Sequence, residues 1–157
     1  MSLKTRFESK CDTVIGDGRH TIVVRDRDIE LSCELSDVHG LASPVSHLSL
    51  VTDRLAHATP DDLKKIGQFL ATRLTYLLEP VGPIESDAEL GVMQLRSTPP
   101  HQDGDTLSYY EILVSRGGEL TLSRYELQAG QDRQAVPAVL TREALLRLVE
   151  DLADAVT

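Results

Sequence analysis

Five polar residues in the second half of the chain have side chains suited to recognising an acidic group. They are Gln94, Arg96, Tyr109, Glu111 and Arg124. If the strands that carry them are neighbours in a sheet, they share one face, and arginines beside a carboxylate can bind an acidic ligand through bidentate hydrogen bonds. The alternative interpretation is a solvated sheet face with a cross-strand salt bridge, which contributes little to stability. The set is therefore a candidate ligand site with a structural alternative.

No familiar catalytic or metal-binding pattern occurs in the sequence. A GxSxG nucleophile elbow, an HExxH zinc motif, a P-loop and an EF-hand loop are all absent. None of the five histidines stands four residues from another ligand on a predicted helix, and Cys11 and Cys33 form no CxxC motif. We therefore predict no catalytic residues, no metal site and no cofactor, and we expect both thiols to be buried.

Charge and hydropathy restrict the partners of the protein. The chain has 157 residues, a formal net charge of −9 and 41% hydrophobic residues. An acidic surface repels nucleic-acid phosphates and anionic membranes, so we expect neither as a partner. No apolar run approaches the ~20 residues that span a bilayer. The polar first residues contain no apolar signal core, which predicts a cytoplasmic protein.

Two adjacent glycines, Gly117 and Gly118, separate two β-rich segments, residues 107–116 and 119–127. They predict a hairpin with a two-residue type I′ turn, which needs positive φ at both positions. That turn would set four pairs of facing residues: Arg116 and Glu119, Leu113 and Leu122, Glu111 and Arg124, Tyr110 and Tyr125. Cross-strand charge and aromatic pairs contribute about 0.2–1 kcal/mol each, which supports the hairpin.

In this predicted register the hairpin has large apolar side chains on both faces. One face carries Leu113, Leu120 and Leu122, and the other carries Tyr110, Ile112, Val114 and Tyr125. A sheet with only one buried face does not show such a pattern. Because three helices leave part of a six-stranded sheet uncovered, we expect a second copy to cover it in a two-fold homodimer.

Further strands are indicated by β-rich or alternating segments at residues 20–25, 29–35, 47–52 and 89–97. The segments between them are polar or rich in glycine and proline, which is typical of loops. The predicted loops are residues 36–44, 97–105 and 128–137, and residues 80–83 form a stiff connector.

Three segments have the apolar periodicity of helices. The first carries Leu3, Phe7, Cys11 and Val14 on one face. The second begins at the cap Thr59, runs to the stop at Pro80 and contains Gly67, which we expect to pack closely against a neighbour. The third follows the cap Thr141. The order α-β-β-β-α-β-β-β-α predicts a single α+β domain, with an antiparallel sheet of about six strands and three helices.

This order of elements in an acidic chain resembles the type III secretion chaperones and the relatives that share their fold. The resemblance covers the whole chain, rests on the order of elements, and leaves the extra hairpin strand and the loop at 97–105 outside the simplest form. It implies an acidic homodimer that binds an extended segment of a partner along apolar patches. We therefore expect a non-enzymatic protein-binding domain, chaperone-like or scaffold-like. The alternatives are a small-molecule-binding or enzymatic domain that uses the polar set, and a structural subunit of a larger assembly.

Overall fold

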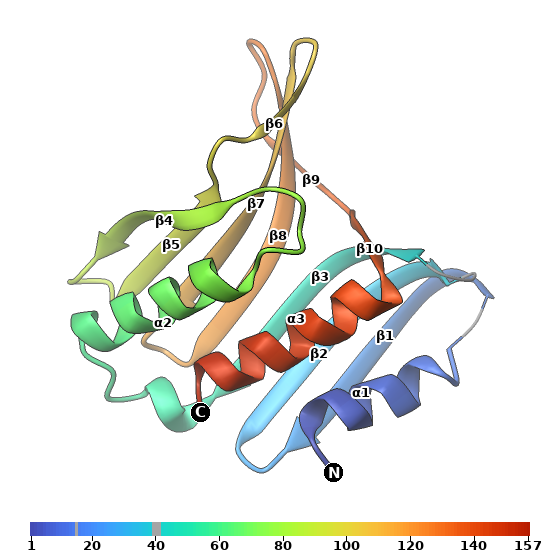
Figure 1. Cartoon of the computed structure of the whole chain (residues 1–157), viewed down its shortest axis with the longest axis vertical. Coiled ribbons are helices and arrows are strands. Elements are labelled where there is room, and N and C mark those ends of the chain that lie inside the picture. Colours follow the sequence, from blue (N-terminus) through green and yellow to red (C-terminus); the bar gives the residue numbers. More distant parts are fainter. Residues whose placement is uncertain (15, 39–41) are drawn as a thin grey trace.

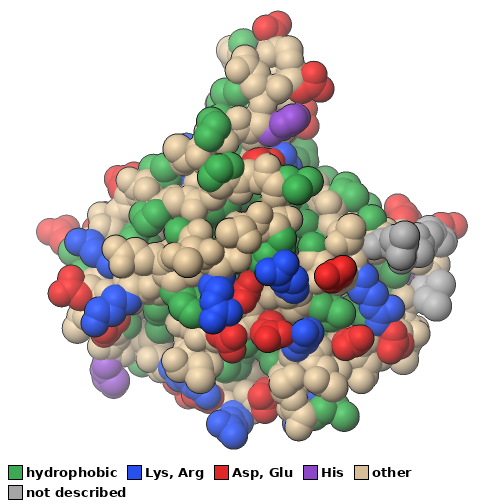
Figure 2. All heavy atoms as spheres, viewed as in Figure 1, with side chains coloured by type: hydrophobic (Ala, Val, Ile, Leu, Met, Phe, Trp, Pro, Cys, Tyr) green, Lys and Arg blue, Asp and Glu red, His purple; other side chains and the backbone are tan. Residues whose placement is uncertain are grey.

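Three α-helices lie on one face of an antiparallel sheet in the computed structural model, which describes residues 1–14, 16–38 and 42–157 (Figure 1). The helices are α1 (Leu3–Cys11), α2 (Pro60–Arg73) and α3 (Arg142–Ala155), with a short 3-10 turn, η1, at Asp53–Leu55. Acidic and basic side chains are interspersed over the helical side of the molecule (Figure 2). The predicted loop at 36–44 includes residues 39–41, which lie outside the described part.

The strands of the sheet follow the order β1-β2-β3-β8-β7-β5-β4, with β10 beside β3, β6 beside β7 and β9 beside β8. Their bounds are β1 Gly16–Asp26, β2 Ile29–Val38, β3 Ala42–Thr52, β4 Val81–Asp87, β5 Val92–Ser97, β6 His101–Asp103, β7 Thr106–Ser115, β8 Glu119–Gln128, β9 Gln134–Val136 and β10 Ala138–Thr141.

The predicted α+β class with three helices is confirmed, but the described residues form ten strands rather than six. The additional strands, β4, β6, β9 and β10, fall in segments predicted as loop or connector or left unassigned. Two of them have only three residues, and β4 contains Pro83, which cannot donate to a ladder. Such short or proline-containing segments have no alternating apolar pattern that sequence reasoning can detect.

The helix starts are as predicted, whereas two helix ends differ. Thr59 and Asp62 form a reciprocal capping box at α2, and the Thr141 side chain accepts from the Ala144 N–H at α3. The first helix ends at Cys11 rather than near Val14, and α2 ends at Arg73, before the apolar stripe does. The chain continues after α2 as a packed turn, so apolar periodicity persists where the helix does not.

The core lies between the helices and the inner face of the sheet, and both cysteines are buried in it. Its largest fully buried side chains are Phe7, Ile22, Leu31, Leu48, Leu50, Leu70, Leu74, Leu95, Ile112, Leu120, Leu122 and Leu148. Close packing at Gly67 is confirmed, because a Cβ there would lie 3.1 Å from Met93 Cε on β5.

The β7–β8 hairpin has a three-residue turn, residues 116–118, and the predicted two-residue turn is wrong. Only Gly118 of the two glycines has positive φ, at 100°, and its N–H donates to the Ser115 carbonyl at 2.9 Å. Ser115 therefore faces Glu119, and all four predicted pairs shift by one residue. The observed pairs include Tyr109 with Tyr125, Tyr110 with Arg124, Glu111 with Ser123 and Ile112 with Leu122.

The corrected register places most large apolar side chains of the hairpin on the inner face. Leu120 and Leu122 face Val114 and Ile112 there, whereas Leu113 stays on the outer face and is 37% exposed. The predicted assignment of these side chains to the two faces is therefore wrong, because a one-residue slip moves one strand's side chains to the other side. The outer face still carries apolar groups, namely Leu113, Tyr109 and Tyr125.

Replacing Gly118 with alanine is expected to destabilise the fold. A Cβ at Gly118 would lie 2.2 Å from the Thr52 carbonyl oxygen. The Thr52 N–H also donates a hydrogen bond to the Gly118 carbonyl, which holds the two backbones together. We expect G118A to lower the free energy of unfolding by about 2 kcal/mol or more in urea denaturation. The matched control is G104A, which also has positive φ, at 60°, but open space around its Cβ. Equal losses in the two variants would contradict a packing role for the turn.

Candidate functional site

Four of the five predicted ligand residues lie together on the outer face of the sheet, which carries no helix in the described part of the chain. Gln94 and Arg96 come from β5, and Tyr109 and Glu111 come from β7. Arg96 is the direct cross-strand neighbour of Glu111. Because alternate residues of a strand share a face, the β5–β7 register alone is enough to assemble this part of the set.

Glu111 is the centre of this cluster and is only 4% exposed. Its Oε2 accepts hydrogen bonds from Gln94 Nε2 at 2.9 Å, Arg96 Nη2 at 3.3 Å and Arg133 Nη1 at 2.7 Å. Burial alone would raise the pKa of Glu111, but the hydrogen bonds from Arg133 and Gln94, with the nearby positive charge, hold it below the ordinary value. Arg96 therefore has a buried carboxylate as its partner.

Two tyrosine rings support the arginines of the cluster. The Arg96 guanidinium lies over the Tyr109 ring at 4.6 Å, and the Arg133 guanidinium lies over the Tyr125 ring at 3.9 Å. The two ring centroids are 5.9 Å apart, and Arg133 also donates to the Tyr109 hydroxyl at 3.3 Å. Cation–π contacts of this kind hold a guanidinium in one orientation while leaving part of it in solvent.

Sequence reasoning missed Arg133 and Tyr125 as members of the cluster. Tyr125 was assigned to the opposite face by the erroneous register. Arg133 lies in the predicted loop at 128–137, where it is the only cation. That isolated positive charge beside a hairpin containing a glutamate was the available signal.

Arg124, the fifth predicted residue, lies on the inner face and does not belong to the cluster. It pairs across the hairpin with Tyr110 and places its guanidinium 4.5 Å from that ring. Its Nη2 donates to Glu79 Oε2 at 2.9 Å, while Arg124 Nη1 and Glu79 Oε1 are buried without a hydrogen-bond partner among the described residues. The one-residue shift of the turn explains why the predicted pairing with Glu111 is wrong.

The outer-face cluster is filled by its own side chains. One carboxylate oxygen already receives three donors, and each of five cavities that open on the described residues is lined by other side chains. An acidic ligand would have to displace a buried carboxylate from both arginines. This geometry favours a structural role for the cluster.

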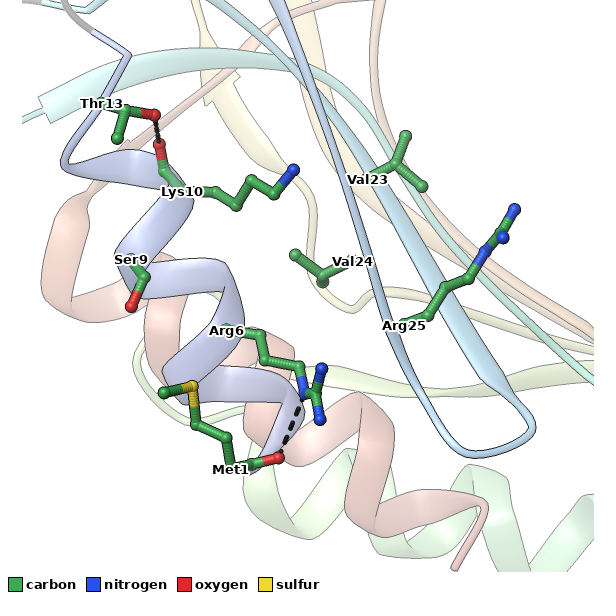
Figure 3. Close-up of a pocket in the computed structure, with 8 residues that line it drawn as sticks. All are labelled: Met1, Arg6, Ser9, Lys10, Thr13, Val23, Val24 and Arg25. Carbon is green, nitrogen blue, oxygen red and sulfur yellow. Dashed lines mark hydrogen bonds between the residues drawn. The ribbon is translucent and has the colours of Figure 1, made fainter.

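The largest of these cavities is an open groove of about 640 Å³ between α1 and β1 (Figure 3). From α1 it is lined by Arg6, Ser9, Lys10 and Thr13, with Met1 before the helix, and from β1 by Val23, Val24 and Arg25. Figure 3 shows the Arg6 and Lys10 side chains reaching from the helix towards the strand, with Val24 between the two elements. The groove therefore has an apolar floor and a basic rim.

The basic rim is not neutralised from the helix side. Lys4 on α1 pairs with Glu150 at 2.9 Å, whereas Arg6 and Lys10 have no acidic partner within residues 1–14, 16–38 and 42–157. Arg6 donates to the Met1 carbonyl at 3.2 Å. Across the groove, Arg25 is bound to Glu30 of β2. Other cations of the described chain, such as Arg27, Lys64 and Lys65, also have no ion pair, so Arg6 and Lys10 are distinguished by their place beside the groove.

The strand beside the groove is an open edge of the sheet. β1 pairs only with β2 in the described part of the chain, so alternate residues direct their backbone N–H and C=O groups away from the sheet. The opposite edge, β4, contains Pro83, a register irregularity and two acidic residues, Glu85 and Asp87. Proline, bulges and charges prevent pairing at exposed edges. The central residues of β1, Thr21–Val24 in the printed sequence, contain none of these features.

Removing the Glu111 charge is expected to destabilise the protein at neutral pH. E111Q leaves Arg96 and Arg133 without their carboxylate and should lower the free energy of unfolding by about 2–4 kcal/mol. Because the folded-state pKa of Glu111 is lowered, its contribution is present above the ordinary value of about 4.3 and is lost as the pH falls through the folded-state value. Urea unfolding of both proteins should therefore show a difference that narrows on acidification.

The control is E119Q, which removes the same charge from an exposed position of the neighbouring strand. It should change stability by no more than about 0.5 kcal/mol. If E111Q is as stable as the wild type at neutral pH, the Glu111 cluster contributes nothing to the free energy of unfolding.

No group of three or more potential ligand side chains in the described residues is placed to hold a metal ion. Within the same residues, no helix is both long and apolar enough to cross a membrane. Compared with protein-family models, curated proteins and solved structures, the chain matches none.

Proposed function

We infer that this chain is a non-enzymatic protein-binding domain that holds an extended acidic segment of a partner protein in the α1–β1 groove. The observation that carries the proposal is the location of Arg6 and Lys10, two cations without an acidic partner in the described chain, beside an open edge strand. An extended segment can satisfy both features at once. Its backbone continues the sheet at β1, and its acidic side chains meet the rim.

The proposed mode of binding is β-strand addition. Main-chain hydrogen bonds supply affinity in this mode, and alternate side chains supply specificity. Each backbone hydrogen bond contributes about 0.5–1.5 kcal/mol net. A bound strand would place every second side chain over Val24 and α1, where apolar residues are favoured. Acidic residues at flanking positions would reach Lys10 and Arg6.

This proposal agrees with the role that the resemblance to type III secretion chaperones implies, and that resemblance stays a prediction. A small-molecule site at Gln94, Arg96, Tyr109 and Glu111 is less favoured, because three donors already occupy the Glu111 carboxylate. A catalytic role has no constellation of side chains to support it among the described residues.

A two-fold homodimer through the outer sheet face also has less support than the sequence indicated. The large hydrophobic side chains exposed there include Val23, Val51, Leu113 and Val139, on four different strands. Between them lie small polar residues such as Ser49 and Thr121. Specific interfaces need an apolar centre, which side chains scattered over separate strands do not provide.

The proposal is tested by selecting ligands from a random peptide library displayed on phage, with peptides of about the length of β1, 11 residues. We expect selected peptides to combine acidic residues with β-branched ones. The double variant R6E/K10E should bind these peptides with a Kd about tenfold higher or more, measured by fluorescence anisotropy. The affinity of the wild type for the peptides should also fall as salt is added. The matched control K64E/K65E makes the same charge change on exposed positions of α2 and should bind normally.

Amide hydrogen exchange locates the bound peptide. Outward-facing amides of β1 should become protected when a selected peptide is added, since they gain hydrogen-bond partners. Protection confined to another strand, or equal weakening by R6E/K10E and K64E/K65E, would overturn the proposed site.

A further inference from the structure

A narrow arm projects from the body of the molecule (Figure 1). We define the arm as residues 98–108 and 125–136, which comprise β6, the first residues of β7, the last residues of β8, β9 and their connections. Its only sheet partners in the described part of the chain are its own strands: β6 pairs with β7, and β9 pairs with β8. In Figure 1 the arm stands at the top, and α1 lies at the lower right.

The arm is acidic, and its acids have no cationic partner. It contains Asp103, Asp105, Glu126 and Asp132. None of the four takes part in an ion pair within the described residues. Its one arginine, Arg133, is turned back onto Glu111. Figure 2 shows acidic side chains at and near the end of the arm.

The arm also offers an open strand edge. β6 has three residues, all exposed, and it pairs only on the side of β7 within the described chain. Its sequence, His101-Gln102-Asp103, is followed by Gly104 and Asp105. An acidic open edge is the chemical complement of the α1–β1 groove, where an open edge lies beside unpaired Arg6 and Lys10.

We propose that the arm of one copy occupies the α1–β1 groove of another copy, with β6 continuing the sheet at β1 and the arm aspartates meeting Arg6 and Lys10. The inference rests on the proposed function, because it names one occupant of the same groove. The arm cannot reach the groove of its own chain, since the two lie at opposite ends of the molecule (Figure 1). The contact is therefore between copies.

This contact joins two different surfaces, so it is heterologous. Repetition gives rings when the rotation closes and open chains when it does not. A three-residue strand forms few hydrogen bonds, and the net charge of −9 on each copy opposes association. The contact is thus weak and salt-sensitive, and a partner segment that fills the whole groove displaces it. Self-association then covers the open β1 edge only while a partner is absent.

Sedimentation velocity of the full chain over a range of concentrations tests the proposal at an ionic strength of about 0.01 M, where the Debye length is about 30 Å. The wild type should exceed the mass of one chain as concentration rises and return to one chain in about 1 M salt. The groove variant R6E/K10E and the arm variant D103K/D105K should each remain monomeric. Circular dichroism checks that both fold, and all four positions are exposed.

Charge complementarity allows a second and decisive test. A mixture of the two double variants should associate, because each supplies the charge that the other lacks. The quadruple variant, with a reversed groove and a reversed arm, should associate like the wild type. A monomeric wild type, association of either double variant alone, or failure of the mixture to associate would overturn the proposal.

Failure of this inference is distinguishable from failure of the proposed function. The arm variant D103K/D105K keeps the groove intact and should bind selected acidic peptides at least as tightly as the wild type, because it lacks the competing arm. Peptide binding without self-association would sink the arm–groove contact alone. If the wild type neither binds acidic peptides nor self-associates, the groove is not a binding site and both proposals fail.

Discussion

The contact between Gly118 and Thr52 determines which side chains of the β7–β8 hairpin face the core. The Gly118 backbone lies so close to the Thr52 carbonyl that no side chain fits between them, and the Thr52 N–H donates to the Gly118 carbonyl. This tie fixes the end of the hairpin against the end of β3. The turn then has three residues, and because side chains alternate along a strand, its length decides the face of every residue on β7 and β8.

Buried charges on both faces of the hairpin depend on that same turn. On the outer face Glu111 has three donors, and on the inner face Arg124 meets Glu79 beside Tyr110. A slip by one residue would turn Glu111 into the core, away from Arg96 and Arg133. The cost of an unpaired buried carboxylate is several kcal/mol, so these pairs act against the wrong register even where they add little net stability.

Sequence reasoning succeeded where one local signal determines the structure. The capping residues Thr59 and Thr141 located two helix starts, and alternation in residues 29–35 located β2 with its inner face. It failed where a contact distant in sequence decides. Nothing near Gly117 and Gly118 in the chain indicates that Thr52 excludes a side chain there, so the turn length and the face of Arg124 were wrong.

The same distinction applies to the candidate sites. Period-two alternation on two adjacent strands brings together Gln94, Arg96, Tyr109 and Glu111, and this alternation can be recognised in the sequence. Arg133 enters from a loop whose path follows from the pairing of β9 with β8. The α1–β1 groove depends on α1 packing beside an edge strand, and neither segment alone reveals which edge of the sheet stays open.

The two edges of the sheet differ in a way that bears on specificity. An open strand edge invites pairing with any exposed strand, and β4 prevents it with Pro83 and acidic residues. On β1 the charged residues are of both signs, Asp17, Arg19, Arg25 and Asp26, and they stand towards the ends of the strand. The central backbone therefore stays accessible, with the unpaired cations Arg6 and Lys10 beside it on α1. Two copies with a net charge of −9 each repel one another over most of their surfaces, whereas Arg6 and Lys10 would attract an acidic strand to this edge. If the groove binds a strand as proposed, Arg6 and Lys10 would repel a basic strand, leave a neutral one unaffected and favour an acidic strand with a free edge.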